Sequence, residues 1–270
     1  LHKAIRRQRQ MCIRDRDKIV TFGEIMLRLS PENNARFTQC NAFEAVYGGG
    51  EANTAVSLAN FDVDANYVTK LPKHIIGQAA INSLRQYGVG VDHIVRGGDQ
   101  IGIYFLEKKT SQRPTNVIYN RAGSAFALAT ADDFDWDEIF DGATWFHFSG
   151  ITPAISDEMT NICITACQKA KEKGMTVSCD LNYRSKLWSS EKACEAMSRI
   201  CQYVDVCIAN EDDAIGIFSM NPADANGEEK NAYIARELMK KFPFKMVASV
   251  WRTETCLLYT SPSPRDMRRS

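Results

Sequence analysis

The distribution of apolar residues along the chain predicts an ordered series of strands and helices. Short apolar runs closed by glycine or polar residues predict buried strands over 18–24, 65–71, 143–149, 175–181, 205–209 and 244–250. Apolar residues at helical spacing predict helices over 51–61, 75–87, 156–173, 190–203, 211–218 and 230–242. From residue 143 onward strands and helices alternate, which is typical of an α/β fold with a parallel sheet and helices on both faces.

Two regions of the N-terminal half break this alternation. Residues 101–108 and 115–121 alternate apolar and polar side chains around a polar turn, and this pattern predicts an antiparallel hairpin. Residues 26–30 and 37–47 contain further short alternating stretches. We therefore expect a small separate sheet, with strands within about 25–47 and 99–122, placed over the larger one.

Composition and charge narrow the class of protein. The chain is 44% hydrophobic and 24% charged, as globular domains are, and no apolar run is long enough to span a bilayer. Nine cysteines without a C-x-x-C pair indicate reduced thiols, so we expect a cytoplasmic protein. The 33 basic residues balance 33 acidic ones, but arginines concentrate at the two ends and leave the body acidic. An acidic body argues against nucleic acid or an anionic membrane as the partner.

The two ends of the chain differ from its body. The strings over 11–16 (MCIRDR) and 256–266 (CLLYTSPSPRD) resemble translated sequencing adapter. A transit peptide and a nucleic-acid-binding tail are the alternatives for such basic termini. We expect one domain over 17–255 that lacks the C-terminal part of its core, and non-native tails over 1–16 and 256–270 that pack poorly against it.

Candidate binding residues follow predicted strands, because α/β sheets bind ligands at the carboxyl ends of their strands. Gly48–Gly50 precede a helix whose free N–H groups would favour an oxygen-rich ligand, although a simple tight turn explains them equally well. Tyr104, Tyr119 and Arg121 lie on the predicted hairpin, with Tyr119 and Arg121 on one face. They could hold a sugar ring and a carboxylate, or form a solvated edge strand.

Two more polar clusters follow later strands. Residues 180–184 (DLNYR) are either a ligand-binding turn or a capped turn. Residues 210–213 (NEDD) open a helix, where acids are favoured by the macrodipole and could also help to hold Mg²⁺ through waters. Cys163, Cys167 and His147 have no second pair for zinc, so we expect them in the core.

Nine segments, in order, resemble the ribokinase-like (PfkB) carbohydrate kinases, and within them the 2-keto-3-deoxygluconate kinase branch. The matching segments are 22–31 (FGEIMLRLSP), 48–60 (GGGEANTAVSLAN), 68–72 (VTKLP), 85–95 (RQYGVGVDHIV), 101–107 (IGIYFLE), 111–125 (SQRPTNVIYNRAGSA), 148–151 (FSGI), 180–188 (DLNYRSKLW) and 209–213 (ANEDD). This resemblance implies a three-layer α/β sandwich with a small β-sheet lid.

The resemblance also implies roles for individual residues. It implies contact with a sugar acid for Gly48, Gly49, Asn53, Tyr104, Tyr119, Arg121 and Arg184. It implies organisation of Mg²⁺ and nucleotide phosphate, without direct metal ligation, for Asn210 and Asp213, with Asp213 in place of the family's usual Glu. Arg28 stands where relatives that act on neutral sugars often carry Asp, and is consistent with an acidic substrate.

The function that this resemblance implies is ATP- and Mg²⁺-dependent phosphorylation of 2-keto-3-deoxygluconate to its 6-phosphate, in a homo-oligomer formed through the lid. One departure is important: the family's G-A-G-D motif, which supplies the catalytic base and the anion hole, does not occur in the 270 residues. We therefore expect the chain itself to be inactive. The alternatives are a fragment that only binds a sugar acid, or a sibling kinase for fructose or a nucleoside.

Overall fold

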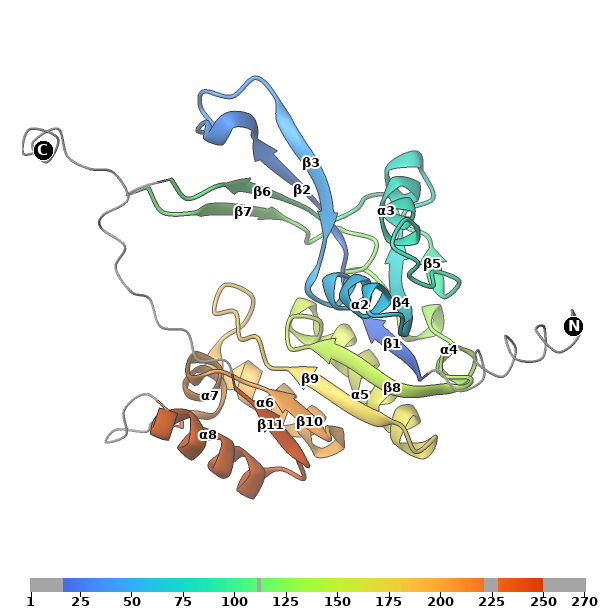
Figure 1. The fold of residues 1–270 in the computed structure, drawn as a ribbon, viewed down its shortest axis with the longest axis vertical. Coiled ribbons are helices and arrows are strands. Elements are labelled where there is room, and N and C mark those ends of the chain that lie inside the picture. The colour runs from blue at the N-terminus through green and yellow to red at the C-terminus, as the bar shows by residue number, and fades with distance from the viewer. Residues whose placement is uncertain (1–16, 111–112, 221–227, 250–270) are drawn as a thin grey trace, which may run out of the picture.

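The computed structural model describes residues 17–110, 113–220 and 228–249, which form two sheets with flanking helices (Figure 1). The larger sheet has the strand order β11-β10-β9-β8-β1-β4-β5, and all its neighbouring strands pair in parallel. Its strands are β1 (Lys18–Phe22), β4 (Asp64–Leu71), β5 (Ile94–Arg96), β8 (Ala143–Ser149), β9 (Thr176–Asp180), β10 (Val206–Ile208) and β11 (Met246–Ala248). The predicted parallel α/β sheet is confirmed.

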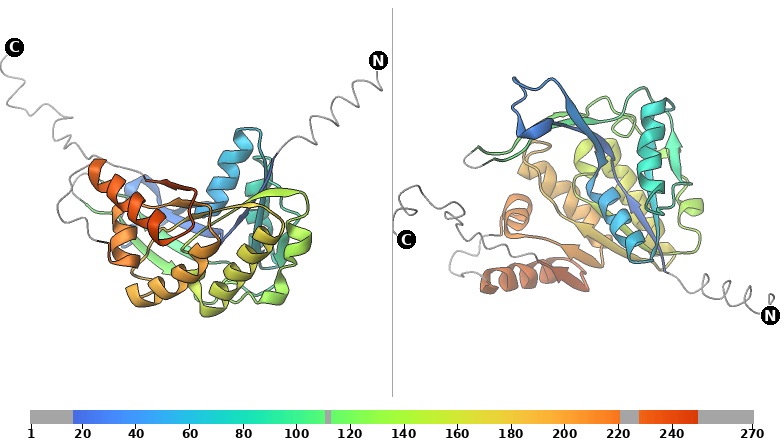
Figure 2. Two further views of the ribbon diagram at one scale, coloured as in Figure 1. Left: turned by 90° about the horizontal axis from the view of Figure 1, so that it is seen from below. Right: turned by 45° about the horizontal axis from the view of Figure 1, so that its top comes forward.

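Helices cover both faces of this sheet (Figure 2). They are α2 (Gly50–Asn60), α3 (Ile75–Arg85), α4 (Trp136–Ile139), α5 (Asp157–Glu172), α6 (Ser190–Ile200), α7 (Glu211–Phe218) and α8 (Glu228–Lys241). Alternate residues of β4 enter different cores: Tyr67 lies in the core with α2 and α3, whereas Val68 joins the core with α5 and α6. Ala52 and Ala55 are buried, and their small side chains let α2 approach β1 and β4 closely.

The smaller sheet, or lid, has the strand order β3-β2-β6-β7 and stands over the carboxyl edge of the large sheet (Figure 1). Its strands are β2 (Met26–Pro31), β3 (Phe43–Gly48), β6 (Ile103–Glu107) and β7 (Asn116–Asn120). The predicted hairpin is confirmed, because β6 and β7 pair antiparallel. Of the alternating stretch at 37–47, the part from Phe43 onward forms strand β3, and the backbone N–H of Phe37 donates a hydrogen bond to the Glu107 carboxylate at 3.2 Å.

The pattern of apolar residues did not reveal β5 and α4, because elements of three and four residues are too short to show a period. Cys163, Cys167 and His147 are buried in the core, as predicted. The expected packing of residues 1–16 and 256–270 lies outside the described residues. At the outer edge of the described sheet, β11 leaves the Met246 side chain 57% exposed. Among the described helices, none has the length and apolar character needed to cross a membrane.

Candidate active site

A cavity of about 710 Å³ lies between lid strand β7 and the carboxyl edge of the large sheet. This volume suits a small organic molecule. Its lining residues come from lid strands β2 and β7, from the start of α2 and from the segments that follow β1, β3, β7, β8 and β9: Glu24, Met26, Gly49, Gly50, Glu51, Val117, Tyr119, Arg121, Ile151, Tyr183, Arg184, Ser185, Lys186 and Leu187. This cavity therefore contains four residues of the predicted site, namely Gly49, Tyr119, Arg121 and Arg184.

The lid supplies an aromatic wall. Tyr104 of β6 and Tyr119 of β7 are register partners, and their rings stack with centroids 5.8 Å apart. Tyr119 lines the cavity and is half exposed, which leaves part of its ring available to a ligand. Tyr104 does not line the cavity; its ring packs against the ring of Tyr119. Such a wall can cover the carbon atoms of a sugar.

The glycine segment before α2 divides between two cavities. Gly49 and Gly50 line the large cavity, whereas Gly48 and Asn53 line a separate one of about 390 Å³ among β3, α2 and α3. Gly49 therefore lines the large cavity without Gly48 and Asn53, and the contact of all three with a sugar acid stays a prediction. Gly49 lies directly against the carbonyl of Glu24, where a side chain would collide with backbone. That close approach requires glycine at this position.

The turn after β9 presents Arg184 to the cavity. Within this turn, Asn182 adopts a left-handed backbone conformation with φ of 38°. The side chain of Arg184 is exposed and, within the described residues, makes no ion pair or hydrogen bond. Lys186 lines the cavity beside it and is also exposed. Two cationic groups therefore face this cavity, and the nearby carboxylates of Asp180 and Asp213 partly compensate Arg184.

Asn210 and Asp213 do not line the cavity but hold this turn in place. The Asn210 side chain accepts a hydrogen bond from the Asp213 N–H at 2.9 Å, and Asp213 accepts one from the Asn210 N–H at 3.0 Å. These two bonds form a capping box at the start of α7. The second oxygen of Asp213 accepts the N–H of Tyr183 at 2.7 Å. The described residues contain no cluster of three acidic, cysteine or histidine side chains suited to a metal, and the relation of this pair to Mg²⁺ stays a prediction.

Asp180, at the carboxyl end of β9, sits in an acidic environment. Partial burial and the nearby Asp213 carboxylate raise the pKa of Asp180 to about 6, and Glu51 contributes in the same direction. Arg184 acts against this shift. Asp180 can therefore exchange a proton close to neutral pH.

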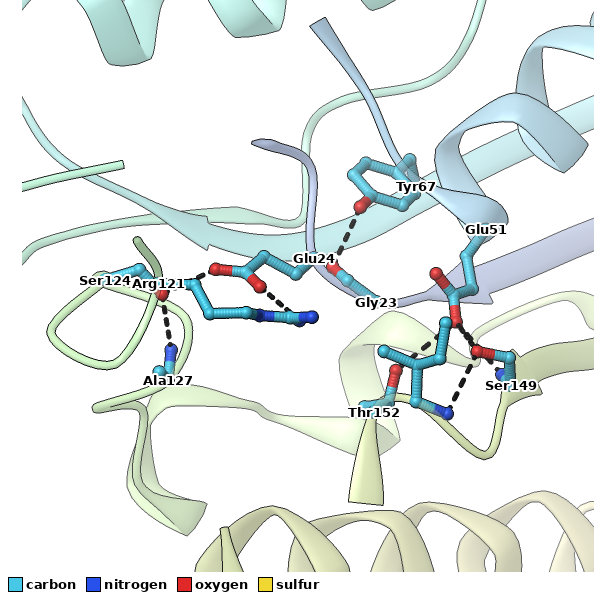
Figure 3. Close-up of polar contacts among 10 residues, drawn as sticks. Gly23, Glu24, Glu51, Tyr67, Arg121, Ser124, Ala127, Ser149 and Thr152 are labelled. Atoms are coloured by element: carbon cyan, nitrogen blue, oxygen red, sulfur yellow. Dashed lines mark hydrogen bonds and ion pairs between the residues drawn. The ribbon is translucent and has the colours of Figure 1, made fainter. Parts of the chain in front are cut away.

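Glu51 ties α2 to the turn after β8 (Figure 3). Its side chain is buried, and one oxygen accepts hydrogen bonds from the Ser149 N–H at 3.0 Å, the Ser149 hydroxyl at 2.5 Å and the Thr152 hydroxyl at 3.3 Å. Burial raises the pKa of Glu51 above its usual value, and these donors oppose the shift. The arrangement fixes the part of the cavity wall that carries Ile151.

Glu24 forms a buried ion pair with Arg121 (Figure 3). Its other oxygen accepts a hydrogen bond from the Ser124 hydroxyl at 2.5 Å. Burial raises the pKa of Glu24, and Arg121 is the strongest influence in the opposite direction. Arg121 was expected to pair with a ligand, but the structure shows that it already has a counter-ion within the protein. The two arginines of the cavity thus differ, because Arg184 alone of the pair is exposed and unpaired within the described residues.

Sequence reasoning missed Glu24 and Glu51 as cavity residues. Glu24 directly follows a buried apolar run at the carboxyl end of a strand, and this position was a usable signal. Glu51 lies in the first turn of a helix, where the macrodipole favours an acid in any protein and so hides a more specific role.

A family model described as pfkB family carbohydrate kinase matches residues 16–247. The chain belongs to this family. PfkB kinases are phosphotransferases, and the predicted ribokinase-like fold and family are confirmed. The chain is 51% identical to the 2-dehydro-3-deoxygluconokinase of Thermotoga maritima, with a TM-score of 0.84 to its crystal structure over 86% of this chain and 72% of that one.

Relatives within the pfkB family carry sugar-acid kinase names. The 2-dehydro-3-deoxygalactonokinase of Haloferax volcanii is 37% identical over 232 residues, which are 85% of this chain and 70% of the relative. The 2-dehydro-3-deoxygluconokinase of Bacillus subtilis is 28% identical over 174 residues, or 64% of this chain and 53% of the relative. The chain thus spans between about half and 70% of these relatives.

Proposed function

We propose that the cavity under the lid binds a 2-keto-3-deoxy sugar acid, and that the intact enzyme transfers the γ-phosphoryl group of ATP to the terminal hydroxyl of this acid. The observation that carries the proposal is that Arg184, which is exposed and forms no ion pair within the part of the chain that the structure describes, lines the same cavity as Lys186 and Tyr119. The names of the relatives support it.

The charges of the cavity suit an anionic ligand. Glu24 and Arg121 neutralise each other, and burial favours the neutral form of Glu51. Arg184 and Lys186 add positive charge to the cavity lining, whereas Asp180 and Asp213, which attract Arg184, do not line the cavity. A guanidinium group can bind a carboxylate through two parallel hydrogen bonds, whereas a neutral sugar offers no group that needs such a partner.

The neutral part of a sugar acid finds matching surfaces. The ring of Tyr119 offers an apolar face to the carbon chain, and the N-terminus of α2 at Gly49 and Gly50 offers backbone N–H groups to hydroxyl or keto oxygens. Contacts to hydroxyl groups decide between epimers, since an unpaired hydroxyl costs binding energy. We favour the gluconate epimer, because the relative that is 51% identical carries that name.

Phosphoryl transfer needs ATP, Mg²⁺ and a group that receives the proton of the attacking hydroxyl. Within this chain, Asn210 and Asp213 hold the turn that carries Arg184, and so orient the acceptor side of the reaction. The G-A-G-D motif does not occur in the 270 residues, so we propose that this chain binds the sugar acid without phosphorylating it. A cytoplasmic location, Mg²⁺ and a homo-oligomer through the lid remain predictions.

Isothermal titration calorimetry tests this function with 2-keto-3-deoxygluconate, its galactonate epimer, fructose and adenosine. We expect the two acids to bind, the gluconate more tightly, and fructose and adenosine to bind at least tenfold more weakly. Fructose or adenosine binding as tightly as the acids would instead support a sibling kinase for a neutral substrate.

A further inference from the structure

Four connections between the large sheet and the lid meet at Glu24. Glu24 itself lies between β1 and β2, and its carbonyl abuts Gly49, which connects β3 to α2. One carboxylate oxygen lies against Gly102, just before β6, and accepts the Ser124 hydroxyl. The other oxygen pairs with Arg121, just after β7. A single residue therefore contacts, through its backbone carbonyl and its carboxylate, connections that are up to 100 positions away in the sequence.

Burial makes the Glu24–Arg121 pair energetically important. The Glu24 side chain is 3% exposed and that of Arg121 is 10% exposed. Within the described residues, Glu24 is the acidic residue at ion-pair distance from Arg121, and the contact joins its Oε2 to Nη2 of Arg121. The buried Nε of Arg121 has no hydrogen-bond partner among these residues. Without Glu24, a buried guanidinium at the cavity wall would lack a counter-ion, which is strongly unfavourable.

We propose that Glu24 is the resident counter-ion of Arg121: it positions this arginine at the cavity wall and reduces its attraction for the carboxylate of a ligand. Arg184 then provides the main attraction for the acid. This inference rests on the proposed function, because it assigns unequal parts to the two arginines of that same site.

The variant Glu24→Gln tests this role, because glutamine keeps the size of the side chain and an oxygen that can accept the Ser124 hydroxyl. It removes only the negative charge, so Arg121 is left buried without a counter-ion. A carboxylate in the cavity would then partly replace the missing charge. We expect the variant protein to be less stable than the wild type but to prefer the acid more strongly over a neutral ligand.

Calorimetry with two probes measures this preference. The acid is 2-keto-3-deoxygluconate, and the neutral probe is 3-deoxyfructose, in which a hydroxymethyl group replaces the carboxylate. Glu24→Gln should raise the ratio of the two affinities by roughly tenfold, as expected for two charges near a protein surface. An unchanged or lower ratio would overturn the proposal, because a purely structural role would alter both affinities alike.

Glu107→Gln is the matched control. Glu107 is also buried in the lid and pairs with an arginine, Arg113, at 3.4 Å, but neither residue lines the cavity. This variant should leave the affinity ratio unchanged. An equal rise in the ratio would show that any lost lid charge acts at long range, and would contradict a specific counter-ion role.

A double-mutant cycle tests the pair without any ligand. Each of Glu24→Gln and Arg121→Gln leaves a buried charge alone, whereas the double variant leaves none, so it should melt at a higher temperature than either single variant. Additive losses of stability in the double variant would overturn the proposal.

The cycle is still informative if Glu24→Gln alone does not fold. In that case a folded double variant supports the proposal. If the double variant is unfolded while Arg121→Gln is folded, the proposal is overturned. If neither probe binds the wild type, the proposed function has failed, and this cycle still decides on the pair.

Discussion

The carboxylate of Asp213 accepts a hydrogen bond from the backbone N–H of Tyr183 at 2.7 Å, across 30 positions of the sequence. The same carboxylate closes the capping box of α7. One buried side chain therefore joins the start of a helix to the turn that presents Arg184 to the cavity. Asn210 and Asp213 are in this way connected to the turn that lines the cavity.

Replacement of Asp213 by alanine should destabilise the protein and weaken ligand binding. The variant removes a helix cap and leaves the N–H of Tyr183 without a partner, at a cost of about 1–3 kcal/mol. Urea unfolding measures the stability, and calorimetry measures the affinity for 2-keto-3-deoxygluconate. Asp212→Ala is the control, because Asp212 is exposed in the same helical turn. If Asp213→Ala and Asp212→Ala changed stability and affinity equally, the negative charge of the first turn of α7 would be responsible, and the hydrogen bond to Tyr183 would not.

Replacement of Arg184 by alanine should selectively weaken binding of the acid. Loss of a charge-assisted hydrogen bond costs about 1.5–3 kcal/mol, or roughly 10- to 150-fold in affinity, while a neutral analogue should change little. Lys192→Ala provides a control, since Lys192 is an exposed cation outside the cavity. If the neutral analogue lost as much affinity as the acid, Arg184 would act on the shape of the turn and not on a carboxylate.

The stability of the protein should depend on pH through Asp180. Its pKa is raised to about 6 in the folded protein, and is about 3.9 in an unfolded chain. Between these values the folded state holds the proton more firmly, so this group makes the free energy of unfolding fall as pH rises from about 4 to about 6. Above about pH 6 Asp180 is ionised in both the folded and the unfolded state. The amount by which it lowers the free energy of unfolding then no longer changes with pH.

Asp180→Asn checks this pH dependence. The stability of the variant relative to the wild type should increase between pH 4 and 6 and stay level above pH 7, as measured by urea unfolding at several pH values. A difference that does not vary with pH would contradict the raised pKa. Asp157→Asn is the reference, because the Asp157 side chain is 92% exposed.

The 270-residue chain should bind the sugar acid without consuming ATP. The G-A-G-D motif, to which the family resemblance assigns the catalytic base and the anion hole, does not occur in the 270 residues. Removal of catalytic groups that act together lowers the rate by many powers of ten. An assay that couples ADP release to NADH oxidation measures this. ADP formation that depends on 2-keto-3-deoxygluconate and exceeds the blank would refute the prediction.

Local pattern was sufficient for most of the fold. The apolar run at 143–149 became β8 with the bounds expected, and the spacing over 211–218 became α7. These elements have strong local signals, because burial of one face imposes a period on the sequence. The strand over Ile94–Arg96 had no such signal in the sequence. It is a strand because its backbone pairs with β4 in the folded protein.

The composition of the site was only partly readable from the chain. Tyr119, Arg121 and Arg184 follow predicted strands or lie on the hairpin, so their approach to one sheet edge could be anticipated. Motif position alone could not separate Gly48 and Asn53 from Gly49, since α2 and β3 divide them between two cavities.

The sequence by itself thus determined the order of elements, the parallel sheet and the set of polar residues near its carboxyl edge. Only the tertiary structure decided which charges are compensated. Arg121 and Arg184 are chemically identical, yet one is buried against Glu24 and the other is exposed beside Lys186. Electrostatic interaction depends on distance and burial in three dimensions, and residues far apart in sequence acquire both only when the chain folds.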